Sequence, residues 1–156
     1  MDTLSVPGTL DSLAQVRSFV KQAAEQAGLE RKRAYRLQLA VDEIATNIIN
    51  YGYARSGQSG EILLTAEINA GSLVLALQDS SPAFDPFTRA RPDNLEQDLS
   101  ERPTGGLGIF LAQENVDEYR YAYRDGCNHN IFVMYRTPPD DAPAGSSAGA
   151  SPGPAA

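Results

Sequence analysis

The order of the hydrophobic patterns along the chain constrains its fold more than any other feature. Apolar residues spaced three and four apart, as on one face of a helix, occupy the first third of the sequence. Short apolar runs of the kind found in strands follow. Helices followed by strands favour an α+β fold: a two-layer sandwich with a mixed, mostly antiparallel sheet and helices on one face. A doubly wound βαβ fold would instead alternate the two patterns.

The first helix is predicted after a short strand at residues 4–6. Asp11 or Ser12 can cap this helix, and Ser12 and Gln15 have the spacing of a capping box. Gly28 is expected to end it, because glycine adopts the left-handed conformation that closes helices.

A second, longer helix is predicted from about Glu30 to about Tyr51, with Gly52 and Gly57 closing it. The basic run at 31–33 is interpreted as a solvated helix start. The apolar stripe of the helix consists of Leu37, Val41, Ile44 and Ile48.

Two β-hairpins are expected in the remainder of the folded part. The first joins 62–68 to 73–77 through a turn, and the second pairs 119–123 with 131–135 across a turn at 125–128. Between the hairpins, an irregular stretch from Asp79 to Gly106 precedes a short helix at about 107–115. Loops of that length inside a compact domain are usually functional.

Composition excludes several classes of function. The net charge of −7 argues against nucleic-acid binding, which needs a basic surface, and against binding to anionic membranes. No apolar run approaches the ~18 residues of a membrane span, and the acidic N-terminus does not resemble a signal peptide. Cys127 is the only cysteine, so no intrachain disulfide can form. We therefore expect a cytoplasmic protein.

The last twenty residues differ from the rest of the chain. Residues 137–156 consist almost entirely of Pro, Ala, Gly, Ser and Asp. Such a segment buries too little apolar area to offset its ordering entropy. The sequence thus predicts a folded domain at 1–136 and a disordered tail at 137–156.

A carboxylate and a carboxamide share one face of the second predicted helix. Glu43 and Asn47 are four residues apart, and so lie one turn from each other. Glu43 can accept a proton or orient a nucleophile. Asn47 can offer a neutral oxygen to Mg²⁺, which prefers few protein ligands plus phosphates and water. Taken alone, the pair is equally compatible with an ordinary solvated helix face.

Two further segments carry polar chemistry. Asp79 follows an apolar strand, where its carboxylate can accept a hydrogen bond from an exocyclic amine such as adenine N6. Gly105, Gly106 and Gly108 precede the predicted short helix, and glycines there allow backbone amides to approach phosphate. No Lys-Ser/Thr pair follows these glycines, so they are not a Walker A loop.

Together, the motifs and their order resemble the GHKL (histidine-kinase-like) ATPase superfamily, and in particular its anti-sigma-factor serine/threonine kinase branch. Residues 41–53 are similar to the N-box of that superfamily, 79–86 to its first glycine box and 105–111 to its second. The chain also matches that branch at 116–121. The resemblance extends over about residues 3–136 and implies the Bergerat ATP-binding fold.

The resemblance implies a role for each matching residue. Glu43 would be the general base, Asn47 would bind Mg²⁺ between the phosphates of ATP, and Asp79 would hold the adenine amine. Phe84 belongs to the branch's Phe-Asp-Pro motif in the first glycine box. The lid over the phosphates would contain Gly105, Gly106, Leu107, Gly108 and Ile109.

One position in the first glycine box departs from the superfamily pattern. Ser81 stands where an Asp-x-Gly motif usually has glycine, so its side chain could crowd the nucleotide or alter its affinity.

Three functions are compatible with these residues. The resemblance favours an ATP-dependent protein serine kinase that phosphorylates a STAS-type antagonist and sequesters a sigma factor or a similar regulator, and it implies a homodimer. Ser81 motivates the alternative of a nucleotide-sensing or catalytically dead adaptor that sequesters a regulator without phosphorylating it. A plain ATPase ranks last, because this chain has none of the extra domains that such enzymes usually carry.

Overall fold

The computed structural model describes residues 1–85 and 112–137. Strand β1 (Asp2–Pro7) leads through the short 3₁₀ turn η1 (Leu10–Ser12) into helix α1 (Leu13–Ala27). Helix α2 (Arg31–Asn47) follows and continues as the π-helix η2 (Ile48–Ala54). The remaining strands are β2 (Glu61–Ile68), β3 (Ser72–Asp79), β4 (Glu118–Arg124) and β5 (Cys127–Tyr135).

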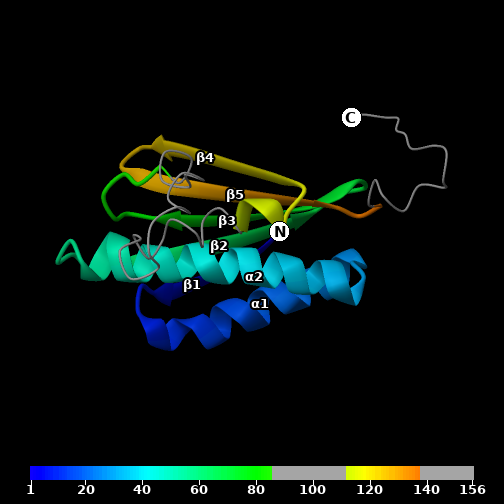
Figure 1. The fold of residues 1–156 in the computed structure, drawn as a ribbon, viewed down its shortest axis with the longest axis horizontal. Helices are drawn as coiled ribbons and strands as arrows, with labels where there is room; N and C mark the ends of the chain where they lie inside the picture. The colour runs from blue at the N-terminus through cyan, green and yellow to red at the C-terminus, as the bar shows by residue number, and fades with distance from the viewer. Residues whose placement is uncertain (86–111, 138–156) are drawn as a thin grey trace, which may run out of the picture.

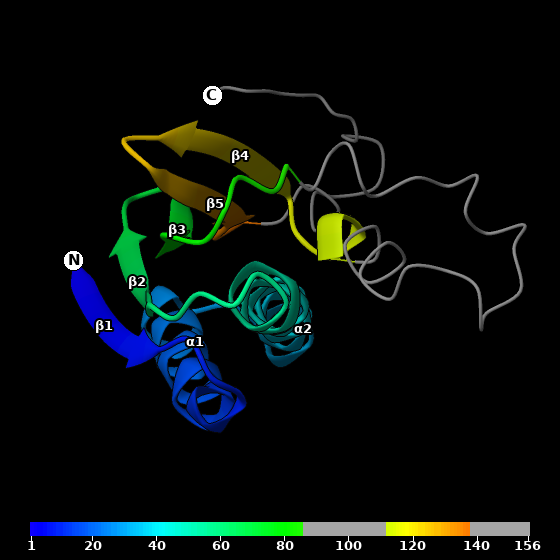
Figure 2. The same cartoon turned by 90° about the vertical axis from the view of Figure 1, so that its left-hand side faces the viewer.

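The strands form one sheet in the order β1-β2-β3-β5-β4. Every neighbouring pair within this sheet is antiparallel. Both α1 and α2 pack against the same face, which gives two layers (Figures 1 and 2). The predicted α+β sandwich is confirmed, although the pairings among the described strands are all antiparallel rather than mixed.

The core lies between the helices and the sheet. The predicted apolar stripe of α2 is buried in full, and it meets the inward side chains of β2, β3 and β5. Alternation along the strands sets which side chains face inward. The inward residues of the three strands include Ile62, Leu64, Leu73, Leu75, Leu77, Phe132 and Met134, all fully or almost fully buried.

The start of α1 differs from its prediction. Ser12 has helical backbone angles, φ −80° and ψ −12°, and makes no side-chain cap bond. Its hydroxyl instead donates to the carbonyl of Pro7 at 2.7 Å, which ties the helix start to β1. The capping box with Gln15 is therefore wrong, because a tertiary acceptor takes the hydroxyl. Gly28 does end the helix, with φ 77°.

The end of the second helix was predicted correctly for one glycine and wrongly for the other. Gly52 lies inside η2 rather than ending the helix, whereas Gly57, with φ 77°, follows its last turn. Single-turn π distortions occur frequently at functional sites, and η2 directly follows Asn47.

The last hairpin is tighter than predicted. Its turn contains only Asp125 and Gly126, both with positive φ, and β5 begins at Cys127. Such a two-residue turn matches the right-handed twist of its strands. Consequently Asn128, which the sequence placed in a turn, belongs to the sheet.

The interpretation of the basic run at 31–33 as solvated is wrong for Arg33, whereas Arg31 and Lys32 are exposed. The Arg33 guanidinium contacts the Asp117 carboxylate at 2.6 Å and donates to the carbonyl of Tyr135 at 2.8 Å. The side chains of Arg33 and Asp117 are only 12% and 17% exposed. This ion pair joins the start of α2 to the far end of the sheet.

Candidate nucleotide site

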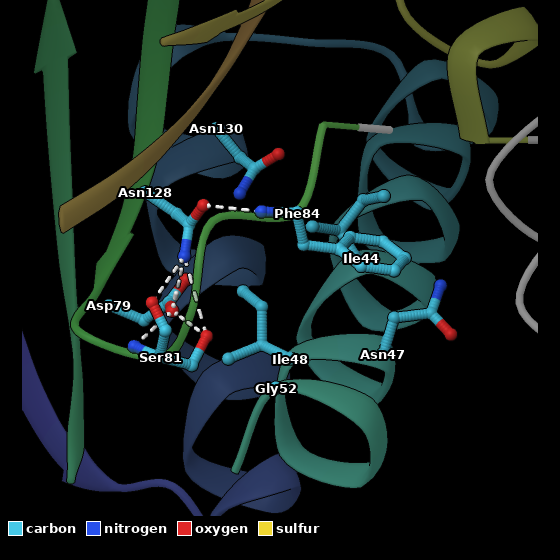
Figure 3. A pocket seen from close by; sticks show the side chains of 9 residues that line it. All are labelled: Ile44, Asn47, Ile48, Gly52, Asp79, Ser81, Phe84, Asn128 and Asn130. Atoms are coloured by element: carbon cyan, nitrogen blue, oxygen red, sulfur yellow. Dashed lines mark hydrogen bonds between the residues drawn. The ribbon is translucent and has the colours of Figure 1, made fainter. Parts of the chain in front are cut away.

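A cavity opens between α2, η2, β3 and β5 at the edge of the core (Figure 3). It has an apolar wall on the α2 side and a polar wall on the sheet side. The cavity is lined by Ile44, Asn47, Ile48, Gly52, Asp79, Ser81, Phe84, Asn128 and Asn130. The structure thus brings together four of the residues predicted from sequence: Asn47, Asp79, Ser81 and Phe84. As it stands, the cavity has a volume of about 20 Å³, room for about one water molecule.

Asp79 is the most buried charged group at this site. The alternation that turns Leu73, Leu75 and Leu77 inward along β3 also turns Asp79 inward, and its side chain is 2% exposed. Its Oδ1 accepts hydrogen bonds from the Ser81 amide at 3.0 Å and the Ser81 hydroxyl at 2.5 Å. Within the described residues, Oδ2 has no hydrogen-bond partner.

The surroundings of Asp79 oppose its charge. Burial raises the pKa of Asp79, and hydrogen bonds from Ser81 and Asn128 and the charge of His129 only partly offset this effect. A buried carboxylate oxygen without a donor is costly. An amine delivered by a ligand would satisfy it.

Asn128 holds the loop that follows Asp79. It lies opposite Asp79 in the β3–β5 register, and its amide nitrogen donates to Asp79 Oδ1 at 3.0 Å. The same nitrogen donates to the carbonyls of Ser81 and Pro82, at 3.0 and 3.2 Å. Its Oδ1 accepts the Phe84 amide at 3.0 Å, so one side chain fixes most of residues 80–84 (Figure 3).

Two tyrosines of β4 orient the asparagine amides of β5. The Tyr121 hydroxyl donates to Asn128 Oδ1, and the Tyr119 hydroxyl donates to Asn130 Oδ1 at 2.5 Å. With its oxygen held by Tyr119, Asn130 turns its amide nitrogen toward the cavity (Figure 3).

The sequence interpretation missed both asparagines as site residues. A signal was present, however, because positions 128, 130, 132 and 134 share one face of a strand. Phe132 on that face is plainly a core residue, so Asn128 and Asn130 must also point inward. Buried polar side chains need partners, and at this edge of the sheet those partners form the site.

The two predicted residues of α2 lie at different depths. Asn47 is 7% exposed and lines the cavity, and its Nδ2 has no partner among the described residues. Glu43, one turn earlier, is exposed and is not among the residues lining the cavity. Partial desolvation and the neighbouring charge of Asp42 raise the pKa of Glu43. The helix therefore contributes a buried asparagine to the lining of the cavity and places an exposed carboxylate outside it.

The structure describes the remaining predicted site residues only in part. Phe84 is half-buried and lines the cavity together with Ile44 (Figure 3). The glycine segment 105–109 lies outside the described residues, as does the tail at 138–156. Of the predicted short helix, residues 112–115 are described: 112–114 are helical and Asn115 is in a turn.

Comparison with known proteins identifies the family. A model of the histidine kinase-like ATPase domain matches residues 6–134, which include every described residue of the cavity. The chain belongs to the histidine kinase-like ATPase domain family. The GHKL resemblance inferred from the sequence motifs is thereby confirmed.

Relatives within the histidine kinase-like ATPase family include bacterial serine kinases. The serine-protein kinase RsbW of Listeria innocua is 27% identical over 127 residues, covering 80% of each chain. RsbW of Staphylococcus aureus is 24% identical over 118 residues, covering 74% of each chain. These proteins are similar to this chain along most of its length.

A solved structure supports the fold. The RsbU and RsbW domains of a Mycobacterium tuberculosis protein match with a TM-score of 0.57 at 17% identity, covering 86% of this chain. This chain spans about a third of that longer one (32%). Within residues 1–85 and 112–137, the structure contains no helix with the length and hydrophobicity needed to cross a membrane.

Proposed function

We propose that this protein is an ATP-dependent protein serine kinase that phosphorylates a STAS-type antagonist and otherwise sequesters a sigma factor or a similar regulator. One observation carries the proposal: a buried carboxylate oxygen and a buried amide, both without partners among the described residues, line the same cavity. Similarity to the RsbW serine-protein kinases supports the choice of reaction.

In this proposal the adenine base lies against the sheet side of the cavity. Asp79 Oδ2 accepts the exocyclic amine, which supplies the missing donor. Ile44, Ile48 and Phe84 provide apolar contact for the ring. Because the cavity has a volume of only about 20 Å³, the base enters only when residues 80–85 move away from α2.

Asn47 would hold Mg²⁺. Its Nδ2 lacks a partner among the described residues, and the oxygen and nitrogen of a side-chain amide can exchange places by rotation of the amide group. A neutral oxygen suits Mg²⁺, which takes most of its other ligands from phosphates and water. When bound, the ion neutralises charge on the phosphates.

Glu43 would be the general base. Its raised pKa brings it closer to the range in which proton acceptance is efficient near neutral pH. The substrate serine oxygen attacks the γ-phosphorus, the bond to the β-phosphate oxygen breaks, and the serine proton passes to Glu43. The exposure of Glu43 allows the acceptor to be a whole protein rather than a small molecule.

The rest of the proposal rests on resemblance and composition. The segment 105–109 would cover the phosphates as a lid. The resemblance also implies a homodimer. A cytoplasmic location is proposed from the composition of the sequence.

Phosphotransfer and nucleotide binding can be tested separately. The protein is incubated with Mg-ATP and a STAS-domain protein of the same host, and phosphoserine is measured by mass spectrometry. We expect transfer by the wild type, none by Glu43→Gln, and unchanged ATP affinity in that variant by calorimetry. Glu25→Gln, exposed on α1, is the matched control and should transfer normally. Equal phosphoserine from wild type and Glu43→Gln would refute the role of Glu43.

The small cavity also supports a second candidate, the adaptor that sequesters a regulator without phosphorylating it. Ser81 and Phe84 line this small cavity together with Asp79. Clear Mg-ATP binding without transfer to any STAS-domain protein would favour this adaptor. Absence of any nucleotide binding would reject the kinase.

A further inference from the structure

Ser81 and Gly52 occupy adjoining positions where η2 meets the loop after β3. A Cβ atom added to Gly52 would lie 2.5 Å from the Ser81 hydroxyl and 2.9 Å from the Ser81 Cβ. Real Cβ atoms essentially never approach other atoms so closely. A side chain at position 52 would therefore require Ser81 to shift from its observed place.

The space left by Gly52 lets the Ser81 hydroxyl reach Asp79. That hydroxyl, the Ser81 amide and the Asn128 amide all donate to the same oxygen, Oδ1. An oxygen with three donors has no acceptor capacity left, since a carboxylate has about two sites on each oxygen. The other oxygen, Oδ2, is buried and has no partner among the described residues.

We propose that Ser81 is a positioning residue for base recognition: its hydroxyl, accommodated by Gly52, fixes the Asp79 carboxylate so that Oδ2 alone faces the base. This inference rests on the proposed function, because it assumes that a nucleotide binds in this cavity. It reverses the expectation from sequence that a side chain at position 81 obstructs the nucleotide.

The consequence is selectivity between purines. A fixed, acceptor-only oxygen matches a 6-amino purine, which donates, and repels a 6-oxo purine, which presents another acceptor. Without the hydroxyl bond, which at 2.5 Å is the shortest of the three, Asp79 is held only by the two amides at 3.0 Å. Oδ2 could then shift further from a 6-oxo group, and the penalty against that base would shrink. Ser81 therefore increases the ratio of ATP affinity to ITP affinity.

Calorimetry with Mg-ATP and Mg-ITP tests the role of the hydroxyl. Ser81→Ala keeps the Cβ beside Gly52 and removes only the oxygen. We expect the ATP-to-ITP affinity ratio to fall about tenfold, the size of one hydrogen bond to a charged group. Ser5→Ala, exposed on β1, is the matched control and should leave the ratio unchanged.

A size exchange separates positioning from packing. Gly52→Ala should displace Ser81 and lower both the melting temperature and the affinity ratio. Gly52→Ala combined with Ser81→Gly moves the methyl group to the other side of the contact. This double variant should regain most of the melting temperature lost in the single variant but not the affinity ratio, because the hydroxyl is still absent.

The outcomes distinguish this inference from the proposed function. If wild type binds ATP and Ser81→Ala retains the wild-type ratio, or loses affinity for ATP and ITP equally, the inference is wrong and the kinase proposal stands. Recovery of the full ratio in the double variant would also overturn it. If wild type binds neither nucleotide, both proposals fail.

Discussion

Tyr53 joins three parts of the fold through one hydroxyl, and its removal gives a quantitative test of the structure. The side chain is 2% exposed. Its ring fills the space beside Gly8 and Gly60, where added Cβ atoms would lie 2.4 and 2.8 Å from ring carbons. Its hydroxyl donates to the carbonyl of Glu61 at 2.7 Å and accepts the amide of Ser80 at 2.9 Å.

Tyr53→Phe keeps the ring and its packing but removes these two hydrogen bonds, together with a longer contact of 3.3 Å to the Ser80 hydroxyl. The Glu61 carbonyl and the Ser80 amide then lose this partner in a largely enclosed place. At about 1 kcal/mol for each hydrogen bond, the free energy of unfolding should fall by about 2 kcal/mol. For a domain of this size that corresponds to a melting temperature lower by roughly 6 °C.

Urea unfolding followed by circular dichroism measures this loss directly. Tyr123→Phe is the matched control, since Tyr123 is 47% exposed on β4, and its unfolding free energy should change little. If the two variants unfold at the same urea concentration, the Tyr53 hydroxyl does not link these segments, and the packing of the loop after Asp79 is not as described.

Three other perturbations follow from the same contacts. Replacing Arg33 by leucine leaves Asp117 without its cation and should lower the free energy of unfolding in urea by about 3 kcal/mol. Arg17→Leu, which breaks the exposed pair with Asp42, should leave the urea midpoint unchanged. Equal losses of stability in the two variants would contradict the difference in burial between the two ion pairs. Because burial raises the pKa of Asp79, the unfolding free energy should fall as the pH rises through that pKa, while ATP affinity should rise. Asp79→Asn should abolish this contribution to the pH dependence of the melting temperature. An unaltered pH profile in that variant would refute the assignment of the effect to Asp79. Asn128→Ala frees residues 80–84 and should lower stability by about 3 kcal/mol and weaken ATP binding at least tenfold; intact ATP affinity would show that the loop needs no such anchor.

Local patterns were sufficient to predict most of the fold. The stripe from Leu37 to Ile48 predicts a helix with one buried face because apolar residues recur at its period. The continuous apolar run at 73–77 predicts a strand. The alternation of inward side chains along that strand turns Asp79 inward. Both features depend only on neighbours in the sequence.

Features that depend on distant partners could not be predicted. Arg33 and Asp117 are 84 residues apart, so nothing local distinguishes Arg33 from an exposed basic residue. The Ser12 hydroxyl bonds to Pro7 because η1 brings them together, although its spacing from Gln15 is that of a capping box. In both cases a tertiary contact determines the outcome.

The residues of the site could be predicted from sequence only in part. Resemblance selected Asn47 and Asp79 correctly as residues of one cavity, but it treated Ser81 as an isolated departure. Whether a serine fits there depends on Gly52, which is 29 residues away in sequence and was interpreted only as a helix terminator. A departure from a family pattern can therefore be judged only together with the residue that it touches.

Of the four buried side-chain atoms without a hydrogen-bond partner among the described residues, Arg33 Nε and Gln113 Nε2 lie elsewhere, and Asn47 Nδ2 and Asp79 Oδ2 belong to residues that line the cavity. The buried polar side chains of Ser12, Asn128 and Asn130 all make hydrogen bonds within the protein. Asp79, in contrast, keeps one oxygen without a partner among the described residues, at a strand position where leucine would continue the pattern of β3. A domain selected for stability alone would place an apolar side chain there, because an unpaired buried carboxylate oxygen is costly. The retained cost is understandable if a donor arrives with the nucleotide.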